Sequence, residues 1–446
     1  MKSIAEVAET LRSVLTEVAA AAGRQSGFVQ RRSKLDGAAF VQAVVFGFQA
    51  TPDASLERLA QMAAMVGVAI TPQGLAQRFG APAAACLKQV LEAAVEQMVT
   101  AGPQPLSVLQ RFSGVYLQDS TTLSLPAALA ELWPGCGGSG SPAALKVQVQ
   151  WNDLNGELSR LSLQPGRAHD GDTPMQQQPL PAGALRLADL GYFRLDVFEA
   201  YNQQGVYWLT RYHLQAHLFT EQGQPLDLVP FLAQQPDQRV ECAVQLGQQH
   251  RLACRLLAVQ VPQAVADRRR QRLHEQACKR GQTVSARAVA LAAWTLLLTN
   301  APAHLLTLDE ALLLGRTRWQ IELLFKRWKS LAGLGHSRSQ QRWTLLCEVY
   351  AKLVGVVVHH WQLLVSGWGL PALSYAKAQC LLQQYTPLLA LALTAPQLLQ
   401  RVFGTLSRVL SHTCRLNTRR RQPTTFQLLL ALESCSSDEQ PLALVA

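Results

Sequence analysis

LRLADLGYF, residues 185–193, is the stretch of this 446-residue chain that indicates its fold class. The apolar run predicts a short buried strand, Asp189 stands at its end, and Gly191 allows a turn into a helix that begins near Asp196. Open α/β sheets bind their ligands at the carboxyl ends of such strands, beside the helices that follow them. The segment therefore predicts an α/β fold with an acidic side chain where a ligand binds.

A second acid follows an earlier strand. Residues 115–119 form a short apolar run that contains Tyr116 and ends in Asp119. We interpret residues 120–122 as a polar turn, which leads into another strand that runs to Leu125. Taken alone, each aspartate is explained at least as well by a turn or a helix cap. The hypothesis of a site therefore depends on the acids meeting at one edge of the sheet.

A basic amphipathic helix is predicted over residues 318–329, with the sequence RWQIELLFKRWK. Four charged residues share one face of this helix, because they follow at intervals of four, four and three residues: Arg318, Glu322, Lys326 and Lys329. One carboxylate among three cations suits a polyanion whose phosphate must reach a metal ion held by the acid. An exposed helix with intrahelical ion pairs shows the same pattern, and this alternative stays open.

Asp119, Asp189 and Glu322 are the candidate metal ligands and catalytic residues. Hard oxygen ligands prefer Mg²⁺ or Mn²⁺ to zinc. Two such ions, about 3.5–4 Å apart, support in-line phosphoryl transfer. The three acids therefore predict a site for two Mg²⁺ ions, with Mn²⁺ as the alternative metal.

The chain resembles the bacterial insertion-sequence transposases of the DDE type that carry a Tyr-Arg-Glu-Lys signature, the IS-four group. Motifs in the family's order carry the resemblance over roughly residues 25–430. They are residues 119–126 around the first acid, residues 189–193 around the second, the strand-like residues 207–211, and Trp294 followed by Thr299-Asn300. The resemblance identifies the three acids as the family's catalytic residues.

The signature itself is matched at three of its four positions. It requires Tyr, two residues, Arg, three residues, Glu, six residues and Lys, and this chain has Arg318, Glu322 and Lys329 at that spacing. The first position departs from the family, because Gly315 stands where the family has Tyr. In the family that Tyr steadies the phosphate of a nucleotide whose flipped base stacks on a Trp, here Trp294.

The resemblance implies a ribonuclease-H-like catalytic core, with three antiparallel strands, a helix, parallel strands and a final helix that carries Glu322. Glu322 follows Asp189 by 133 positions (322 − 189), which leaves room for an insertion. We expect a helical DNA-binding domain, a core in two segments, a β-rich insertion domain and a helical C-terminal domain that could serve dimerisation: residues 1–108, 109–212 with 286–345, 213–285 and 346–446. The α/β core is thus flanked by all-α domains.

The resemblance also implies a transposase that cuts and joins DNA at the terminal repeats of its own insertion sequence, through a hairpin intermediate and as a synaptic homodimer. Its partners are double-stranded transposon ends and target DNA. The candidate DNA contacts are Arg318, Lys326, Lys329, Trp294, Arg211, Arg31 and Arg32. The alternative is a catalytically silent DNA-binding protein that represses movement. The three acids favour the enzyme, and the missing Tyr favours the repressor.

Composition agrees with a DNA partner. The chain has 41 Lys+Arg against 30 Asp+Glu and a net charge of +11, which suits a polyanion, although basic proteins without such a partner are common. Nine cysteines without a Cys-x-x-Cys pair indicate reduced thiols and neither a disulfide framework nor a zinc site. We find no secretory signal in the sequence. Polar residues interrupt the most apolar stretch, residues 345–365, so we expect a core helix there and not a membrane span. A cytoplasmic, nucleoid-associated protein is expected.

Three further patterns leave alternatives open. Thr71 and Pro72 predict a helix start inside a helix-turn-helix, which either reads DNA or belongs to an ordinary bundle. The charged residues 267–280 are either a DNA contact or an exposed helix. His359 and His360 point to different faces of a helix, so we predict a packing or surface role for them and not a metal site.

Overall fold

The computed structural model describes residues 3–31, 34–137, 140–368, 373–416, 427–429 and 431, and Arg32 lies outside these ranges. The chain forms two compact units, each assembled from distant segments. The first unit comprises Met1–Gln104, Asp119–Ala168 and Gln320–Arg421. The second comprises Pro105–Gln118, His169–Trp319 and Gln422–Ala446. The domain boundaries expected from the sequence stay a prediction.

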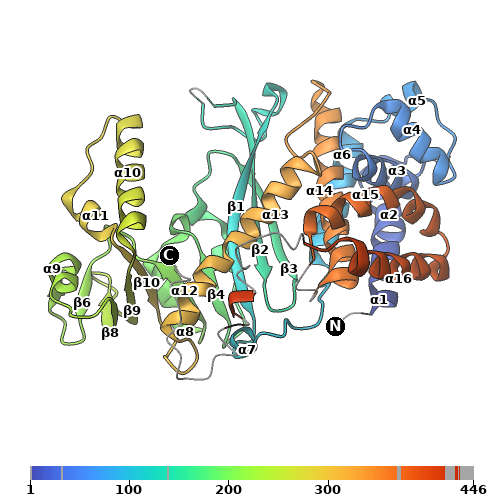
Figure 1. Cartoon of the computed structure of the whole chain (residues 1–446). Helices are drawn as coiled ribbons and strands as arrows, with labels where there is room; N and C mark the ends of the chain where they lie inside the picture. The colour runs from blue at the N-terminus through green and yellow to red at the C-terminus, as the bar shows by residue number, and fades with distance from the viewer. Residues whose placement is uncertain are drawn as a thin grey trace. The chain divides into compact units, whose positions relative to one another are not determined.

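The second unit is built on a mixed sheet with the strand order β1-β4-β5-β10-β9-β8-β6-β7 (Figure 1). Its strands are β1 (Val115–Leu125), β4 (Leu185–Ala188), β5 (Tyr207–Arg211), β6 (Leu218–Thr220), β7 (Pro225–Leu226), β8 (Arg239–Leu246), β9 (Leu252–Gln260) and β10 (Trp294–Thr299). β4 runs parallel to both β1 and β5, and the pairs from β5 to β7 are antiparallel. Helix α8 (Leu195–Gln203) makes the crossover that the parallel pair β4–β5 requires.

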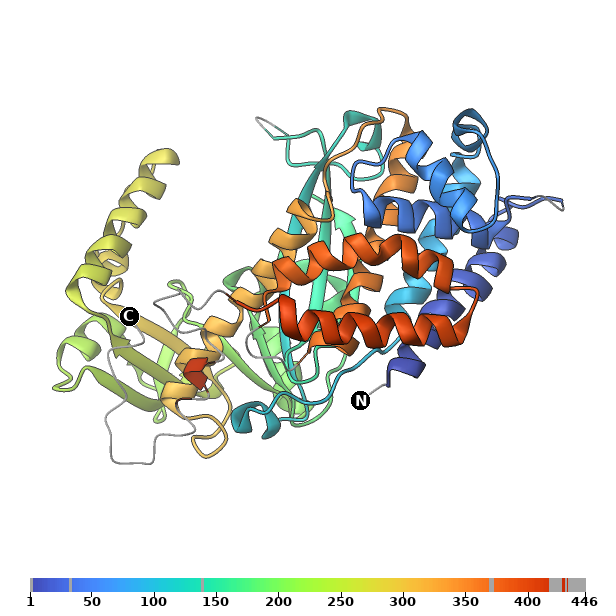
Figure 2. The ribbon, with the colours of Figure 1, turned by 45° about the vertical axis from the view of Figure 1, so that its right-hand side comes forward.

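The remaining helices of the second unit follow the same segments. They are α7 (Ser107–Gln110), α9 (Leu228–Ala233), α10 (Gln263–Lys279), α11 (Ala286–Leu291) and α12 (Leu308–Thr317). The main core lies between the sheet and α8, where Trp208 stacks on Phe198 with ring centroids 4.5 Å apart. The charged segment of the sequence forms α10, which extends from the strands as a largely exposed helix (Figure 2).

The first unit is mainly helical around α14 (Arg342–Gly367). Its other helices are α1 (Ile4–Ser13), α2 (Ala19–Gln25), α3 (Gly37–Ala50), α4 (Leu56–Met65), α5 (Pro72–Ala76), α6 (Ala81–Glu96), α13 (Trp319–Ser330), α15 (Tyr375–Ala392) and α16 (Pro396–Thr413), with a π-helical turn at Val14–Val18. α14 packs against α3, α6 and α16, and α15 lies beside α16 (Figure 2). The strand β1 also enters this unit, next to the hairpin of β2 (Ala143–Asn152) and β3 (Leu158–Pro165).

Helix α14 contains the apolar stretch that the sequence predicts as a core helix. It is buried along most of its length from Leu345 on, and Glu348 and Lys352 pair inside the core, with Lys352 Nζ 2.7 Å from Glu348 Oε1. Lys352 also donates to the carbonyls of Gly333 and His336. Pairing and hydrogen bonding stabilise these charges in an apolar setting. In the part of the chain that the structure describes, no helix combines the length and apolar character of a membrane span.

Two local predictions from the sequence are confirmed. Thr71 caps α5, because its Oγ1 accepts from the backbone N–H of Gly74 at 3.1 Å, and Pro72 is the first helical residue. The alternating residues 146–151 and the run 157–163, joined by Asn155-Gly156, predict a hairpin, and β2 and β3 form it. Gly156 in its turn has a φ of 73°, a value that favours glycine. The described cysteines are free thiols.

Two other predictions are wrong. Residues 120–122 form no turn, because β1 continues to Leu125 with Thr121, Leu123 and Leu125 buried in alternation with exposed neighbours. Threonine has a high strand propensity, and this alternation supplies the half-buried surface that a strand needs. The helix expected before the parallel strands is also absent from the described chain. Two 3₁₀ turns, Asp170–Asp172 and Pro174–Gln177, stand there instead, in a segment interrupted by prolines.

Candidate active site

Asp189 stands directly after β4, as the sequence predicts. It precedes the 3₁₀ turn Leu190–Tyr192, and α8 begins at Leu195. The Asp189 side chain is half-buried and does not cap the turn. Among the described residues its carboxylate has no hydrogen bond or ion pair, although four arginines line the same cavity. An acid in this setting is available to a cation.

A cavity of about 270 Å³ opens beside Asp189 on one face of the second unit's sheet. The strand register explains which side chains meet there. Leu187 pairs with Leu209, and Arg211 pairs with Leu297, so alternation along each strand places these side chains on one face. The full lining is Leu187, Ala188, Asp189, Leu209, Thr210, Arg211, Arg269, Thr295, Leu297, Leu312, Gly315, Arg316 and Arg318.

The position of Asp119 follows from the pairing of β1 with β4. Gln118 is the partner of Ala188, so Asp119 and Asp189 are the next residues along two neighbouring parallel strands. Along β1, Asp119 shares a face with Leu117, the partner of Leu187. The backbone N–H of Ser120 donates to Asp119 Oδ1 at 2.8 Å. Asp119 therefore lies on the face of β1 opposite to Gln118.

Glu322 is half-buried on α13, in the first unit. The predicted apolar side of this helix is confirmed, because Ile321, Leu324 and Trp328 are buried. One part of the prediction is wrong: Arg318 is not in the same helix as Glu322. Arg318 ends α12, where it lines the cavity, and α13 begins one residue later.

The two lysines predicted beside Glu322 differ in their environment. Lys326 is exposed on α13. Lys329 is half-buried, and burial lowers the pKa of its ammonium group. Arg31 is exposed in the segment between α2 and α3. These side chains stay candidates for DNA contacts.

Asp189 is the residue whose surroundings suit a divalent cation. It lines the cavity, and its carboxylate has no hydrogen-bond or ion-pair partner in the described chain. Within the ranges given above, no three His, Cys, Asp or Glu side chains lie close enough together to hold a metal ion. Asp119 and Glu322 belong to the first unit and Asp189 to the second. The three-acid metal site stays a prediction.

Trp294 lies on the other face of the sheet. It is the first residue of β10, and its neighbours Thr295 and Leu297 line the cavity, whereas Trp294 packs against the core formed with α8. Trp294 lines a separate cavity together with Leu291 and Leu232. The structure therefore does not bring Trp294 together with Asp189 or Arg318.

Sequence reasoning missed Arg269 and Arg316 as lining residues of the cavity. Arg269 is on α10 and donates to the carbonyl of Trp294 at 3.0 Å and to Thr295 Oγ1 at 3.1 Å. Burial and the nearby guanidinium of Arg211 lower the pKa of Arg269. The sequence predicts the charged segment 267–280 to be a DNA contact or an exposed helix, but nothing in the segment indicates which of its arginines packs against the sheet.

A buried arginine lies on the core face, beneath the two aspartate positions. Arg186 on β4 is fully buried and donates to Gln118 Oε1 from Nε at 3.1 Å and from Nη2 at 2.9 Å. Its Nη2 also donates to Gln176 Oε1 at 2.8 Å, and burial lowers the pKa of the guanidinium. Gln118 directly precedes Asp119, so this network fixes the strand that carries the first acid.

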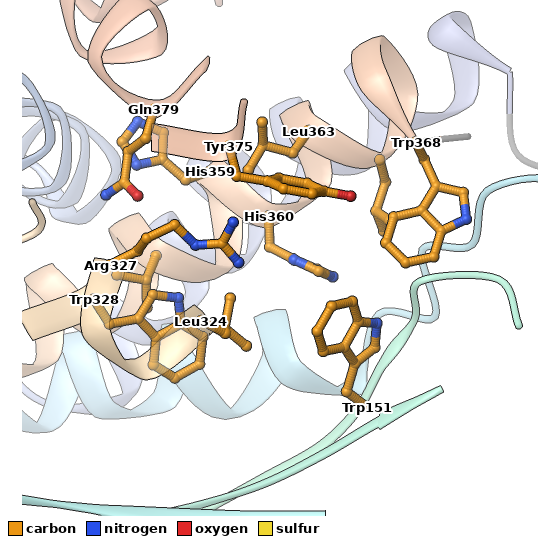
Figure 3. Close-up of a pocket in the computed structure, with 12 residues that line it drawn as sticks. Trp151, Leu324, Arg327, Trp328, His359, His360, Leu363, Trp368, Tyr375 and Gln379 are labelled. Atoms are coloured by element: carbon orange, nitrogen blue, oxygen red, sulfur yellow. The ribbon is translucent and has the colours of Figure 1, made fainter. Parts of the chain in front are cut away.

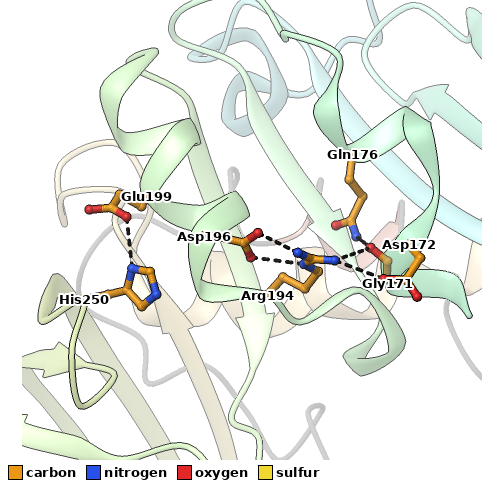
Figure 4. A network of polar contacts seen from close by, with 7 residues as sticks. All are labelled: Gly171, Asp172, Gln176, Arg194, Asp196, Glu199 and His250. Atoms are coloured by element: carbon orange, nitrogen blue, oxygen red, sulfur yellow. Dashed lines mark hydrogen bonds and ion pairs between the residues drawn. The ribbon is translucent and has the colours of Figure 1, made fainter.

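Figure 4 shows how the network continues to the surface. Gln176 donates to the carbonyl of Gly171 at 2.7 Å. Arg194, just before α8, donates to the same carbonyl and forms ion pairs with Asp172 and Asp196 at 3.0 and 2.7 Å. These contacts hold the segment between β3 and β4 against the start of α8, the helix that follows Asp189 in the sequence.

The two histidines of α14 serve packing, as predicted. Both are buried beside Arg327, Trp151 and Tyr375 around a small cavity (Figure 3). Burial lowers the pKa of His359 to about 3 and that of His360 to about 4, so both are neutral at pH 7. The ring of His360 lies 2.6 Å from the carbonyl of Gly156, and the guanidinium of Arg327 lies over the ring of Tyr375 at 4.6 Å.

Comparison with known proteins gives a consistent result. A family model described as a transposase DDE domain matches residues 110–356. The transposase for insertion sequence element IS231F of Bacillus thuringiensis subsp. israelensis is 25% identical over 371 residues, which is 78% of each chain. The transposase for IS231C of Bacillus thuringiensis subsp. berliner is 27% identical over 367 residues, 78% of this chain and 76% of that one. The transposase for IS1151 of Clostridium perfringens is 23% identical over 358 residues, 75% of each chain.

Among solved structures, a cryo-EM structure of the piggyBac transposase synaptic complex with hairpin DNA aligns with 95% of this chain and 87% of its own. The TM-score is 0.43 and the sequence identity 7%, a likeness too low to support an inference.

Proposed function

The chain belongs to the family of transposase DDE domains, and we propose that it cuts and joins DNA at the terminal repeats of its own insertion sequence. One observation carries the proposal: the carboxylate of Asp189, which has no partner among the described residues, lies at the end of a parallel strand beside a cavity lined by arginines. A carboxylate next to several guanidinium groups suits a metal-bound phosphate of DNA.

Asp119, Asp189 and Glu322 would hold two Mg²⁺ or Mn²⁺ ions. When bound, the ions would activate a water molecule or a 3′-hydroxyl group and stabilise the leaving oxygen. The register supports this assignment, because Asp119 and Asp189 follow paired residues of adjacent parallel strands. Glu322 follows Arg318, which lines the cavity, by four residues.

The DNA would be held by cationic side chains around these acids. Arg318 and Arg211 line the cavity, and we propose that they neutralise phosphates beside the cut, together with Lys329 and Lys326 on α13. Contacts with phosphates fix the position of DNA without reading its sequence. Arg31 and Arg32 are proposed contacts at the helical N-terminal part of the chain.

A ribonuclease-H-like core is the architecture proposed for this activity. Its support is the parallel neighbours β1, β4 and β5 and the β2–β3 hairpin that follows β1 in the sequence. Residues 109–212 and 286–345 would form the core, and residues 213–285 the insertion. Residues 1–108 would bind DNA. Residues 346–446 would serve a homodimer, in which excision proceeds through a hairpin intermediate.

The experiment that tests this proposal is cleavage of a labelled duplex that carries the element's own end. With Mg²⁺, Asp189→Asn should lower cleavage by orders of magnitude and leave end binding nearly unchanged, since affinity depends mainly on phosphate contacts. The matched control is Asp172→Asn, an exposed acid paired with Arg194 outside the cavity. Equal cleavage by Asp189→Asn and the wild-type protein would reject the site.

A further test separates the enzyme from a silent repressor. A repressor binds the element's ends but cuts neither strand in Mg²⁺ or Mn²⁺. Gly315, in place of the family's Tyr, is the feature that motivates this comparison. Strand cleavage by the wild-type protein that Glu322→Gln abolishes would decide for the enzyme.

A further inference from the structure

We propose that the cavity beside Asp189 binds one phosphate group of the DNA backbone, and that Arg211 and Arg269 are its principal ligands. Arg269 comes from α10, a helix of the insertion, and Arg211 ends β5. The inference rests on the proposed function, because it assigns a substrate group to the cavity that contains a candidate metal ligand. Neither the signature motif nor the three acids include Arg269.

The first argument is charge. Arg211 and Arg269 line the same cavity, where burial and the guanidinium of Arg211 lower the pKa of Arg269. The guanidinium of Arg211 has no hydrogen bond or ion pair with any residue in the described ranges. Arg269 donates only to neutral oxygens, the carbonyl of Trp294 and the hydroxyl of Thr295. Two neighbouring guanidinium groups that form no ion pair with a described carboxylate suit an anion.

The second argument is geometry. Arg269 uses one N–H of Nη1 and one of Nη2 to hold β10, and this fixes the plane of its guanidinium at the cavity wall. A guanidinium has five N–H donors, so three remain for a ligand. Thr295 brings its hydroxyl group to the same wall, where it accepts from Arg269. Arginine and threonine together are typical ligands of phosphate oxygens.

The third argument is space. Gly315 on α12 lines the cavity, and a Cβ placed there would meet nothing nearer than Leu297 Cδ1 at 3.9 Å. The cavity of about 270 Å³ is therefore open up to this position. A phosphate has room beside Arg211 and Arg269, and a larger residue at position 315 would occupy that room.

The test uses the full chain, inorganic phosphate as the probe, and the thermal unfolding midpoint at constant ionic strength. A ligand that binds only the folded protein raises the midpoint in a saturable way. We expect such a rise for the wild-type protein. Arg269→Gln and Arg211→Gln should each raise the half-saturating phosphate concentration by about tenfold or more, since each removes a charge-assisted ligand.

Two further variants separate a cavity site from a general effect of charge or folding. Arg268→Gln removes the same charge from an exposed neighbour on α10 that does not line the cavity, and it should respond to phosphate like the wild-type protein. Gly315→Leu keeps every charge, suits a helix better than glycine, and should lose the response. A loss with Arg268→Gln equal to that with Arg269→Gln, or a full response in Gly315→Leu, would overturn the proposal.

A DNA measurement decides whether the phosphate belongs to DNA. For duplex binding, Arg269→Gln should lower the slope of log affinity against log salt by about one. An unchanged slope with a phosphate response that depends on Arg269 would assign the cavity to free phosphate and overturn the DNA assignment. The phosphate response requires neither metal nor cleavage. A protein that shows it but never cuts DNA contradicts the proposed function alone, and a cutting protein without it contradicts this inference alone.

Discussion

Replacing Gln118 with leucine tests whether the buried network around Arg186 holds the strand that carries Asp119. Gln118 Oε1 accepts two of the three hydrogen bonds recorded for the Arg186 guanidinium, so the Gln118→Leu variant leaves that cation with Gln176 Oε1 alone. Hydrogen bonds to a charged group contribute about 1.5–3 kcal/mol each, and removing a partner of a buried charge costs about 3–5 kcal/mol. We expect the free energy of unfolding to fall by about 3–5 kcal/mol.

Thermal unfolding followed by circular dichroism gives the measurement. A domain of about 150–250 residues loses about 2–4 °C per kcal/mol, so the transition of the second unit should fall by about 6–20 °C. Gln150→Leu is the matched control, because Gln150 is a buried strand glutamine whose amide has no hydrogen-bond partner among the described residues. Its replacement should be neutral or stabilising.

Gln118→Glu is the second control. A carboxylate at position 118 would accept from both Nε and Nη2 of Arg186. Its second oxygen would take the place of Gln118 Nε2, which has no hydrogen-bond partner in the described chain. This variant should retain the stability of the wild-type protein. The reasoning is refuted if Gln118→Leu unfolds within about 1 °C of the wild-type protein, or if Gln118→Glu falls as far as Gln118→Leu.

Three other predictions follow from the described side chains. Lys329→Ala should weaken DNA binding and lower the salt slope of the affinity by about one, and an unchanged slope in a salt titration would make Lys329 an ordinary surface charge. Burial raises the pKa of Asp153 to about 7, above about 3.9 for the unfolded chain, so its contribution to stability is complete at low pH and is lost as the pH rises from about 4 to about 7. Urea unfolding at several pH values should show that the free energy of unfolding of the Asp153→Asn variant lacks this fall between about pH 4 and about pH 7. Parallel pH profiles for the variant and the wild-type protein would contradict the prediction. Trp294→Ala should lower the stability of the second unit by about 1–3 kcal/mol, because the indole packs against the core. Unchanged stability together with a defect confined to hairpin formation would instead support base stacking by Trp294.

The sequence is most informative where a local pattern determines a local structure. The apolar run before Asp189, the glycine after it and the start of α8 need only neighbouring residues, and the structure has all three as predicted. The turn predicted after Asp119 fails because Ser120 and the threonines that follow are polar. Polarity was a poor guide there, since alternating burial along β1 decides their conformation.

The cavity could be predicted only in part, for a physical reason. Asp189, Arg211 and Arg318 carry recognisable sequence signals, and they line one cavity. Arg269 reaches the same cavity through α10, whose packing against β10 depends on contacts between distant residues. No local pattern distinguishes Arg269 from Arg268 next to it, although one lines the cavity and the other is exposed.

The two faces of the sheet explain how a cluster of repelling cations can persist beside Asp189. Successive residues of a strand point to opposite faces, so Gln118 and Asp119 lie on opposite faces of β1, and Trp294 enters the core while Thr295 lines the cavity. A shift of one residue in the pairing of β10 would exchange the two sets. Buried Leu298 and the core around α8 oppose that shift, because it would expose them. The packing of the core face therefore determines which side chains lie on the cavity face. Arg211 and Arg269 are kept near each other by this strand register, to which their own charges do not contribute.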